Sequence, residues 1–150
     1  TVEEEEIAHA ISLLMERAKL IVEGAAATTL AAVLNDKINI QGKKIAIVLS
    51  GGNIDLDMIS TIIDRGMIKA GRRISFETSL FDKPGALRDL LSVISETGAN
   101  VISVTHDRLT PEISIKHAQV QVSLETKNSE HVKEIIKTLE NHDYEIKGLK

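Results

Sequence analysis

The stretch that most constrains the fold of this chain is residues 82–108, in which a turn, a helix and a strand follow closely on one another. Pro84 and Gly85 mark the turn, because proline is favoured at the first position of a helix and glycine tolerates strained backbone. Apolar residues at the i, i+3, i+4 and i+7 spacing predict a helix with one buried face, at Leu87, Leu90, Leu91 and Ile94. Gly98 is suited to end this helix, and the β-branched residues in 100–106 predict a strand.

Alternating sequences on either side of this stretch predict further strands. Apolar and polar residues alternate over 74–80 and over 118–125, which is typical of strands with one buried and one solvated face. A turn is predicted at Thr110-Pro111, a helix over 129–139 and a last strand over 144–147. The second half therefore has a βαββαβ order, which predicts a ferredoxin-like sandwich of one sheet and two helices.

The first half of the chain predicts helices around one buried strand. Helical patterns cover 7–21, 25–34 and 54–65. The almost continuous apolar run at 44–49 is typical of a strand that is buried on both faces in a parallel sheet. Such a strand needs neighbours and no second one is found, so residues 1–71 are predicted to be an incomplete α/β segment of a larger domain. Together with residues 72–150, this makes an α+β chain of two parts.

Composition narrows the classes of function. The chain has 150 residues and a formal net charge of −4 with both signs interspersed, which disfavours binding to nucleic acid. It contains no cysteine, so disulfides and thiolate chemistry are excluded, which fits a cytoplasmic protein. No apolar run reaches the length of a membrane span, and we expect no membrane association. His106 and His117 could face each other, but no carboxylate or cysteine stands at a ligand spacing from them, so we expect no metal site.

The order of motifs in the second half resembles the ACT domain, a regulatory module that binds amino acids. The resemblance rests on a strand followed by Asp-x-Pro-Gly-Ala-Leu, a short helix, and Gly-Ala-Asn-Val-Ile at the start of the next strand. It implies homo-oligomers that pair through their ACT domains, and a small amino-acid effector bound near the turn between strand and helix. The matching effector-binding positions are Asp82, Pro84, Gly85, Ala86, Leu87, Asn100 and Ile102.

Physical chemistry supports this effector site and also offers a plainer interpretation. Amide groups at a helix N-terminus can hold a carboxylate, and Asp82 or Asn100 could bind an ammonium group. The same two residues would also serve as a helix cap and a turn residue, so both interpretations stay open at this point. An RNA-recognition domain shares the βαββαβ order but needs sheet aromatics and a basic field. Phe76 and Phe81 in an acidic chain do not provide them.

A second candidate site lies at Ser50-Gly51-Gly52-Asn53, between the predicted buried strand and the helix that follows it. Ligands of α/β sheets usually bind at this place, where a helix N-terminus favours anions and glycines admit a close ligand. A short glycine motif of this kind is also common in plain tight turns.

The segment Glu-Gly-Ala-Ala-Ala from Glu23, the Ser-Gly-Gly-Asn turn and the ACT-like half together resemble the C-terminal part of threonine dehydratases. These are pyridoxal-phosphate enzymes of fold type II. The resemblance implies that the Ser50 hydroxyl bonds the pyridine nitrogen of pyridoxal phosphate. The other cofactor-site positions that it implies are Gly51, Gly52, Asn53, Glu23 and Gly24. It further implies an intact enzyme of isoleucine biosynthesis that converts L-threonine, with serine as a second substrate, into a 2-oxo acid (2-oxobutanoate from threonine) and ammonia.

Two motifs of that family have no counterpart in residues 1–71. These are the Ser-x-Lys motif, which carries the Schiff-base lysine, and the glycine-rich phosphate loop. We therefore assign no catalytic residue, expect no cofactor bound to these residues alone, and expect an inactive fragment of a longer enzyme. The alternative is a non-catalytic, ACT-type amino-acid sensor or assembly module in which residues 1–70 form a helical extension.

Overall fold

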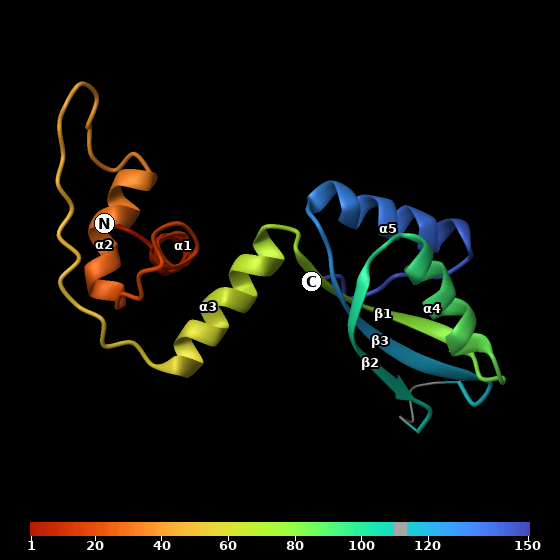
Figure 1. Ribbon diagram of the computed structural model, residues 1–150. Coiled ribbons are helices and arrows are strands. Elements are labelled where there is room, and N and C mark those ends of the chain that lie inside the picture. The colour runs from red at the N-terminus through yellow and green to blue at the C-terminus, as the bar shows by residue number, and fades with distance from the viewer. Residues whose placement is uncertain (110–113) are drawn as a thin grey trace. The chain divides into compact units, whose positions relative to one another are not determined.

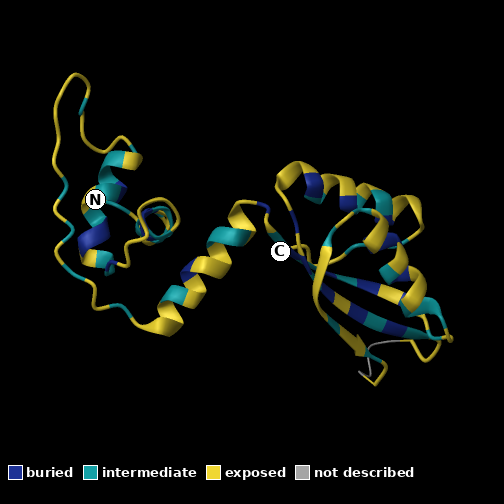
Figure 2. Cartoon of the chain, viewed as in Figure 1, coloured by how far each residue is buried: buried dark blue, intermediate teal, exposed yellow. Residues whose placement is uncertain are grey.

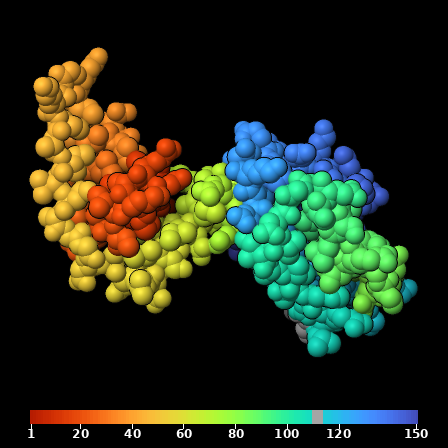
Figure 3. Space-filling model, in the orientation of Figure 1, coloured from red at the N-terminus to blue at the C-terminus, as the bar shows by residue number. Residues whose placement is uncertain are grey.

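The computed structural model describes residues 1–109 and 114–150, so the turn predicted at Thr110-Pro111 lies outside the described residues. The chain divides into two compact units, Thr1–Gly66 and Met67–Lys150 (Figure 1 and Figure 3). Among the described helices, none has the length and hydropathy of a membrane-spanning segment.

The second unit contains a three-stranded antiparallel sheet that packs against two helices (Figure 1). Its elements in chain order are β1 (Arg73–Phe81), α4 (Ala86–Glu96), β2 (Asn100–Asp107), β3 (His117–Glu125) and α5 (Ser129–Asn141). The strands lie in the order β1-β3-β2, so β3 separates the two strands that precede it in the chain. This arrangement confirms the predicted succession of strands and helices from β1 to α5.

The alternation along β1 and β3 places one face of the sheet in the core, as the sequence predicts. Figure 2 shows it as alternating dark and light bands along the strands. The buried residues face one another in register: Ile74 with Leu124, Phe76 with Val122, Thr78 with Val120 and Leu80 with Ala118. The helices cover this face with fully buried side chains from Leu90, Ile94, Ile135 and Leu139. The core is therefore aliphatic and packed around one buried ring, that of Phe76.

Glycines flank α4 at both ends. Gly85 precedes the helix with a φ of 91° and Gly98 follows it with a φ of 74°. Both lie in the left-handed region, which glycine adopts at no steric cost, so the predicted role of Gly98 is confirmed. Pro84 was predicted at the first helical position, and this is wrong. The helix begins at Ala86, because the left-handed Gly85 keeps Pro84 in the preceding turn.

The predicted regular strand over 144–147 is wrong, since a shorter and bulged pairing on the outer edge of β1 takes its place. Tyr144 and Ile146 pack against the core before the pairing begins. Lys147 exchanges backbone hydrogen bonds of 2.8 Å with Glu77, and Lys150 does so with Ser75 at 2.9 and 3.0 Å. Successive pairs are thus two residues apart on β1 and three apart on the C-terminal segment. The extra residue makes a β-bulge in which Gly148 has a left-handed φ of 58°.

The first unit is a small cluster of helices with an extended segment. Its elements are α1 (Glu4–Leu13), the π-helical turn η1 (Leu14–Ala18), α2 (Gly24–Leu34) and α3 (Leu56–Lys69), which begins in this unit. Alanine side chains allow α1 and α2 to pack closely, and Ala10, Ala27 and Ala31 are fully buried. The predicted helix over 7–21 ends earlier than expected, because Lys19 has a left-handed φ of 60°.

Residues 44–49 do not form the buried strand that the sequence predicts. They lie outside regular secondary structure, and Ile45 and Val48 are 48% and 74% exposed. A strand needs neighbours that bind its amide and carbonyl groups, and no strand of the described residues pairs with this run. The prediction that this apolar run is a buried strand is therefore wrong.

The acid stability of the first unit should depend on Glu6. Its carboxylate accepts a 2.8 Å hydrogen bond from the Glu3 amide and lies 3.0 Å from the Lys37 ammonium. The amide, and then Lys37, hold the pKa of Glu6 below its ordinary value of 4.5. The ionised form is thus favoured by folding, so its contribution is present above the unfolded pKa and is lost as the pH falls through the folded pKa.

We therefore expect Glu6→Gln to destabilise the chain at neutral pH and to make stability less sensitive to acid below pH 4.5. Urea unfolding followed by circular dichroism at a series of pH values would measure both effects. Glu4→Gln, an exposed change in the same helical turn, is the control. An equal pH dependence in both variants would contradict the assignment to Glu6.

Candidate functional site

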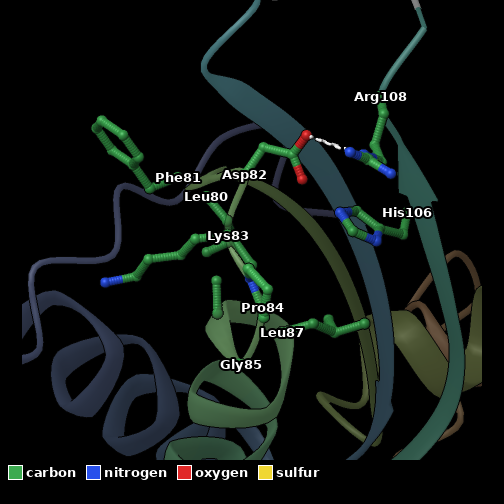
Figure 4. Close-up of a pocket in the computed structure, with 10 residues that line it drawn as sticks. Leu80, Phe81, Asp82, Lys83, Pro84, Gly85, Leu87, His106 and Arg108 are labelled. Atoms are coloured by element: carbon green, nitrogen blue, oxygen red, sulfur yellow. Dashed lines mark hydrogen bonds and ion pairs between the residues drawn. The ribbon is translucent and has the colours of Figure 1, made fainter.

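A hollow of about 350 Å³ lies where β1 ends and α4 begins (Figure 4). Five of the predicted effector-binding residues line it, namely Asp82, Pro84, Gly85, Ala86 and Leu87. Leu80 adds an apolar wall, and His106 and Arg108 join from the end of β2 and the residue beyond it. The structure therefore brings most of the predicted site together and adds three basic residues to its lining, Lys83 from the turn and His106 and Arg108 from the β2 side.

An ion pair joins Asp82 to Arg108 at this hollow. The Nε and Nη2 atoms of Arg108 both donate to Oδ2 of Asp82, at 2.9 and 2.7 Å. The Asp82 amide also donates to the Lys116 carbonyl at 2.9 Å, which holds the turn beside the start of β3. Since β3 separates β1 from β2, the ion pair links the ends of two strands that are not neighbours.

The turn before α4 shapes the floor of the hollow. The Lys83 amide donates to the Phe81 carbonyl at 2.8 Å, and the Ala86 amide donates to the Lys83 carbonyl at 3.2 Å. This places the N-terminus of α4, the positive end of its dipole, at the hollow. In Figure 4 the side chains of Phe81 and Lys83 point away from the side on which Asp82 and Arg108 meet.

Two predicted effector-binding residues lie outside the lining of this hollow. Asn100 begins β2, at the end of the strand away from His106, and its Nδ2 donates to Glu125 at 3.3 Å. Ile102 is 48% exposed and lies at an irregularity where the β2–β3 register shifts. All seven residues belong to the same sequence motif, so the motif could not show that only five of them meet at the turn.

Sequence reasoning missed Arg108 as a binding residue and considered His106 only as a metal ligand. The two residues are spaced i, i+2 at the end of a predicted strand, and this spacing puts side chains on one face. That signal was available from the sequence. Their approach to Asp82 depends on the sheet order, which the sequence does not state.

The histidines do not form a metal site within the described residues, where no group of three or more potential ligands occurs. His106 is opposite Val120, whereas His117 is opposite Phe81 and packs on its ring at 4.8 Å between centroids. They therefore do not face each other. His131 is buried, with 6% of its surface exposed, and its ring bonds the Lys127 amide and the Thr97 carbonyl.

The second candidate site is assembled from segments that are far apart in sequence. The Glu23 amide donates to the Gly51 carbonyl at 3.0 Å, and the Glu23 carboxylate accepts from the Asn53 amide at 3.3 Å. A Cβ added at Gly51 would overlap this carboxylate, so a larger residue there would displace the Glu23 side chain from the turn. Glu23 also precedes the first residue of α2, Gly24. The structure thus brings Glu23 to the turn that begins at Ser50, whereas Gly24 is only its neighbour in the chain.

Both units of the chain are similar to known proteins. Residues 72–144 match the ACT domain family. The L-threonine ammonia-lyase of Thermotoga maritima is 50% identical over 146 residues, which are 97% of this chain and 36% of that protein. The L-threonine ammonia-lyase of Geobacter sulfurreducens is 46% identical over 149 residues, or 99% of this chain and 37% of that protein.

The chain thus spans somewhat more than a third of the length of these relatives. Both resemblances drawn from the sequence, to ACT domains and to threonine dehydratases, are confirmed. Residues 72–144 are an ACT domain, in a chain that is related over almost its whole length to L-threonine ammonia-lyases.

Proposed function

We propose that this chain is part of a pyridoxal-phosphate-dependent threonine ammonia-lyase whose ACT domain binds an amino-acid effector. The observation that carries the proposal is the 46–50% identity to L-threonine ammonia-lyases over 97–99% of the chain. That relatedness includes the first unit, which favours the enzyme over a free-standing sensor module. Conversion of L-threonine into 2-oxobutanoate and ammonia is proposed for a protein that contains this chain.

We assign residues 1–71 to the cofactor-binding catalytic domain and residues 72–150 to the regulatory domain. The turn from Ser50 to Asn53 fits a flat phosphorylated cofactor, because Ser50 is exposed, Gly52 has no side chain and Glu23 fixes the turn. Pyridoxal phosphate supplies an electron sink when bound. The neutral Ser50 hydroxyl would hold the pyridine nitrogen, and Glu23 would keep the turn in place through Gly51 and Asn53. Since no lysine here is assigned a covalent role, we expect these residues to be inactive alone.

The hollow between β1 and α4 is the proposed effector site. It combines a helix N-terminus, charged groups of both signs and an apolar wall, which are the features that an amino acid requires. We also propose that the ACT domains pair into homo-oligomers. An effector would regulate the enzyme if it bound two states of the assembly with different affinities.

Calorimetric titration of the 150-residue chain with isoleucine, valine, threonine and serine tests the effector site. We expect saturable binding of at least one of them, and a loss of about tenfold or more in affinity with Asp82→Ala, which removes a charged hydrogen-bonding group. Asn100→Ala is the matched control, because Asn100 does not line the hollow. An unchanged affinity in Asp82→Ala, or a loss confined to Asn100→Ala, would place the site elsewhere. No binding of any of the four to a folded sample would contradict the proposal for these ligands.

A further inference from the structure

We propose that Asp82 and Arg108 form an internal ion pair that a zwitterionic amino acid replaces, its carboxylate binding Arg108 and its ammonium group binding Asp82. This rests on the proposed binding of an amino acid at the hollow and adds the basis of recognition. Arg108 thereby becomes a binding residue, and the ligand class narrows to molecules that carry both charges on one carbon.

The geometry of the pair leaves both partners able to bind a ligand. Two nitrogens of Arg108 donate to the single oxygen Oδ2 of Asp82, so Oδ1 takes no part in this pair. A guanidinium group makes two parallel hydrogen bonds to a carboxylate when it uses both oxygens, which is stronger and more directional than the arrangement with Asp82. A ligand carboxylate can therefore offer Arg108 a better partner than the one it has.

The exposure of the two side chains favours replacement of each partner in the ion pair by a ligand group. The Arg108 side chain is 61% exposed and the Asp82 side chain is 23% exposed. Exposed ion pairs contribute little to stability, because solvent screens both charges. Splitting this pair therefore costs little, and the more buried Asp82 stays at the hollow to receive the ligand's ammonium group.

The need to pair every charge explains why the ligand should be a zwitterion. The hollow contains one negative and one positive side chain in the ion pair, and an amino acid adds one charge of each sign. Both ion pairs are then complete after binding. A ligand with only a carboxylate would leave Asp82 without its partner, and a ligand with only an amine would leave Arg108 without its own.

The remaining walls suit a small side chain. Leu80, Pro84 and Leu87 are apolar, and the volume of about 350 Å³ lies at the low end for sites that bind small molecules. The N-terminus of α4 adds a positive potential that also favours the ligand carboxylate. These features favour a free amino acid over a peptide or a nucleotide.

The chain contains a matched control for this ion pair. Arg88 donates from Nε and Nη2 to a single oxygen of Asp89, at the same distances of 2.9 and 2.7 Å. This pair is also exposed, but neither residue lines the hollow. Arg88→Gln and Asp89→Asn therefore remove the same chemistry at side chains of α4 that do not line the hollow, although the Arg88 guanidinium lies close to Gly85.

The test is calorimetric titration of the full chain and of Arg108→Gln, Asp82→Asn, Arg88→Gln and Asp89→Asn. The probes are valine, isoleucine, threonine and serine, with valinamide and 3-methylbutanoate as analogues that lack the carboxylate and the amino group of valine. The other three amino acids are compared with their own amide and deamino analogues. We expect Arg108→Gln and Asp82→Asn to lose about tenfold or more in affinity, and the two controls to stay within about twofold.

Analogue selectivity separates recognition from a structural role. We expect Asp82→Asn to lower the affinity for the amino acid. The affinity for the deamino acid should stay unchanged or improve, because the variant lacks the carboxylate that repels this ligand. Suppose that the parent chain binds an amino acid. If Arg108→Gln binds that amino acid equally well, or if the parent chain binds the amide analogue equally well, the ion-pair exchange is overturned while the effector site stands. If the parent chain binds none of the four, the proposed effector site itself fails for these ligands.

Discussion

Gly71→Ala should destabilise the second unit by about 2–4 kcal/mol, as the sum of left-handed strain and overpacking. Gly71 has a φ of 64°, and an added Cβ would lie 2.6 Å from the amide nitrogen of Ser129 and 2.8 Å from its Cα. These are backbone atoms at the start of α5, so they cannot rotate away. The Gly71 carbonyl also accepts a 2.6 Å hydrogen bond from the buried Thr126 hydroxyl, which the shift would disturb.

Gly98→Ala is the matched control for this prediction. Gly98 has a similar φ of 74°, but nothing lies within 4 Å of the place where its Cβ would be. It should therefore show only the conformational cost, about 1 kcal/mol. Urea unfolding followed by circular dichroism measures the free energy of unfolding of both variants. Equal losses would show that the contact with Ser129 does not affect stability.

Phe76→Ala should cost more, about 3–5 kcal/mol, which is the usual range for a fully buried phenylalanine. Phe76 is 0% exposed and lies opposite Val122 in the centre of the paired strands. Its loss leaves a cavity that the surrounding aliphatic side chains fill only in part. Domains commonly have a stability of about 5–15 kcal/mol, so this single change would remove much of it.

Phe81→Ala provides the comparison, because the chain has only these two phenylalanines. Phe81 lies at the other end of β1 and is 57% exposed, with its ring against His117. We expect a loss of about 1 kcal/mol or less, the scale of one aromatic contact. With a urea slope of about 1–3 kcal/mol/M, the midpoints of the two variants should differ by about 1 M or more. Coinciding midpoints would contradict the described core.

The second half of the chain was predictable because its signals are local. Alternation at 74–80 identified the buried face of β1, and the spacing from Leu87 to Ile94 identified the buried face of α4. Each pattern is complete within one element, so the sequence suffices. The bulge at Gly148 was missed because it arises from pairing with Ser75 and Glu77, which are far away in the sequence.

In the candidate sites too, local sequence places some residues together, whereas others meet only through the tertiary structure. Asp82 and Gly85 belong to one turn, so a motif places them together. Arg108 meets Asp82 only because β3 holds the ends of β1 and β2 at a fixed distance, and no local pattern contains that information. Similarly, Glu23 reaches Gly51 through the packing of the first unit.

The unpaired run at 44–49 has a consequence for handling the isolated chain. Residues 45–50, Ile-Ala-Ile-Val-Leu-Ser, are uncharged, rich in β-branched side chains and free of proline. Segments of this kind stack between molecules into cross-β aggregates when their backbone groups are exposed. A neighbouring strand that satisfied those groups would therefore protect the protein from aggregation.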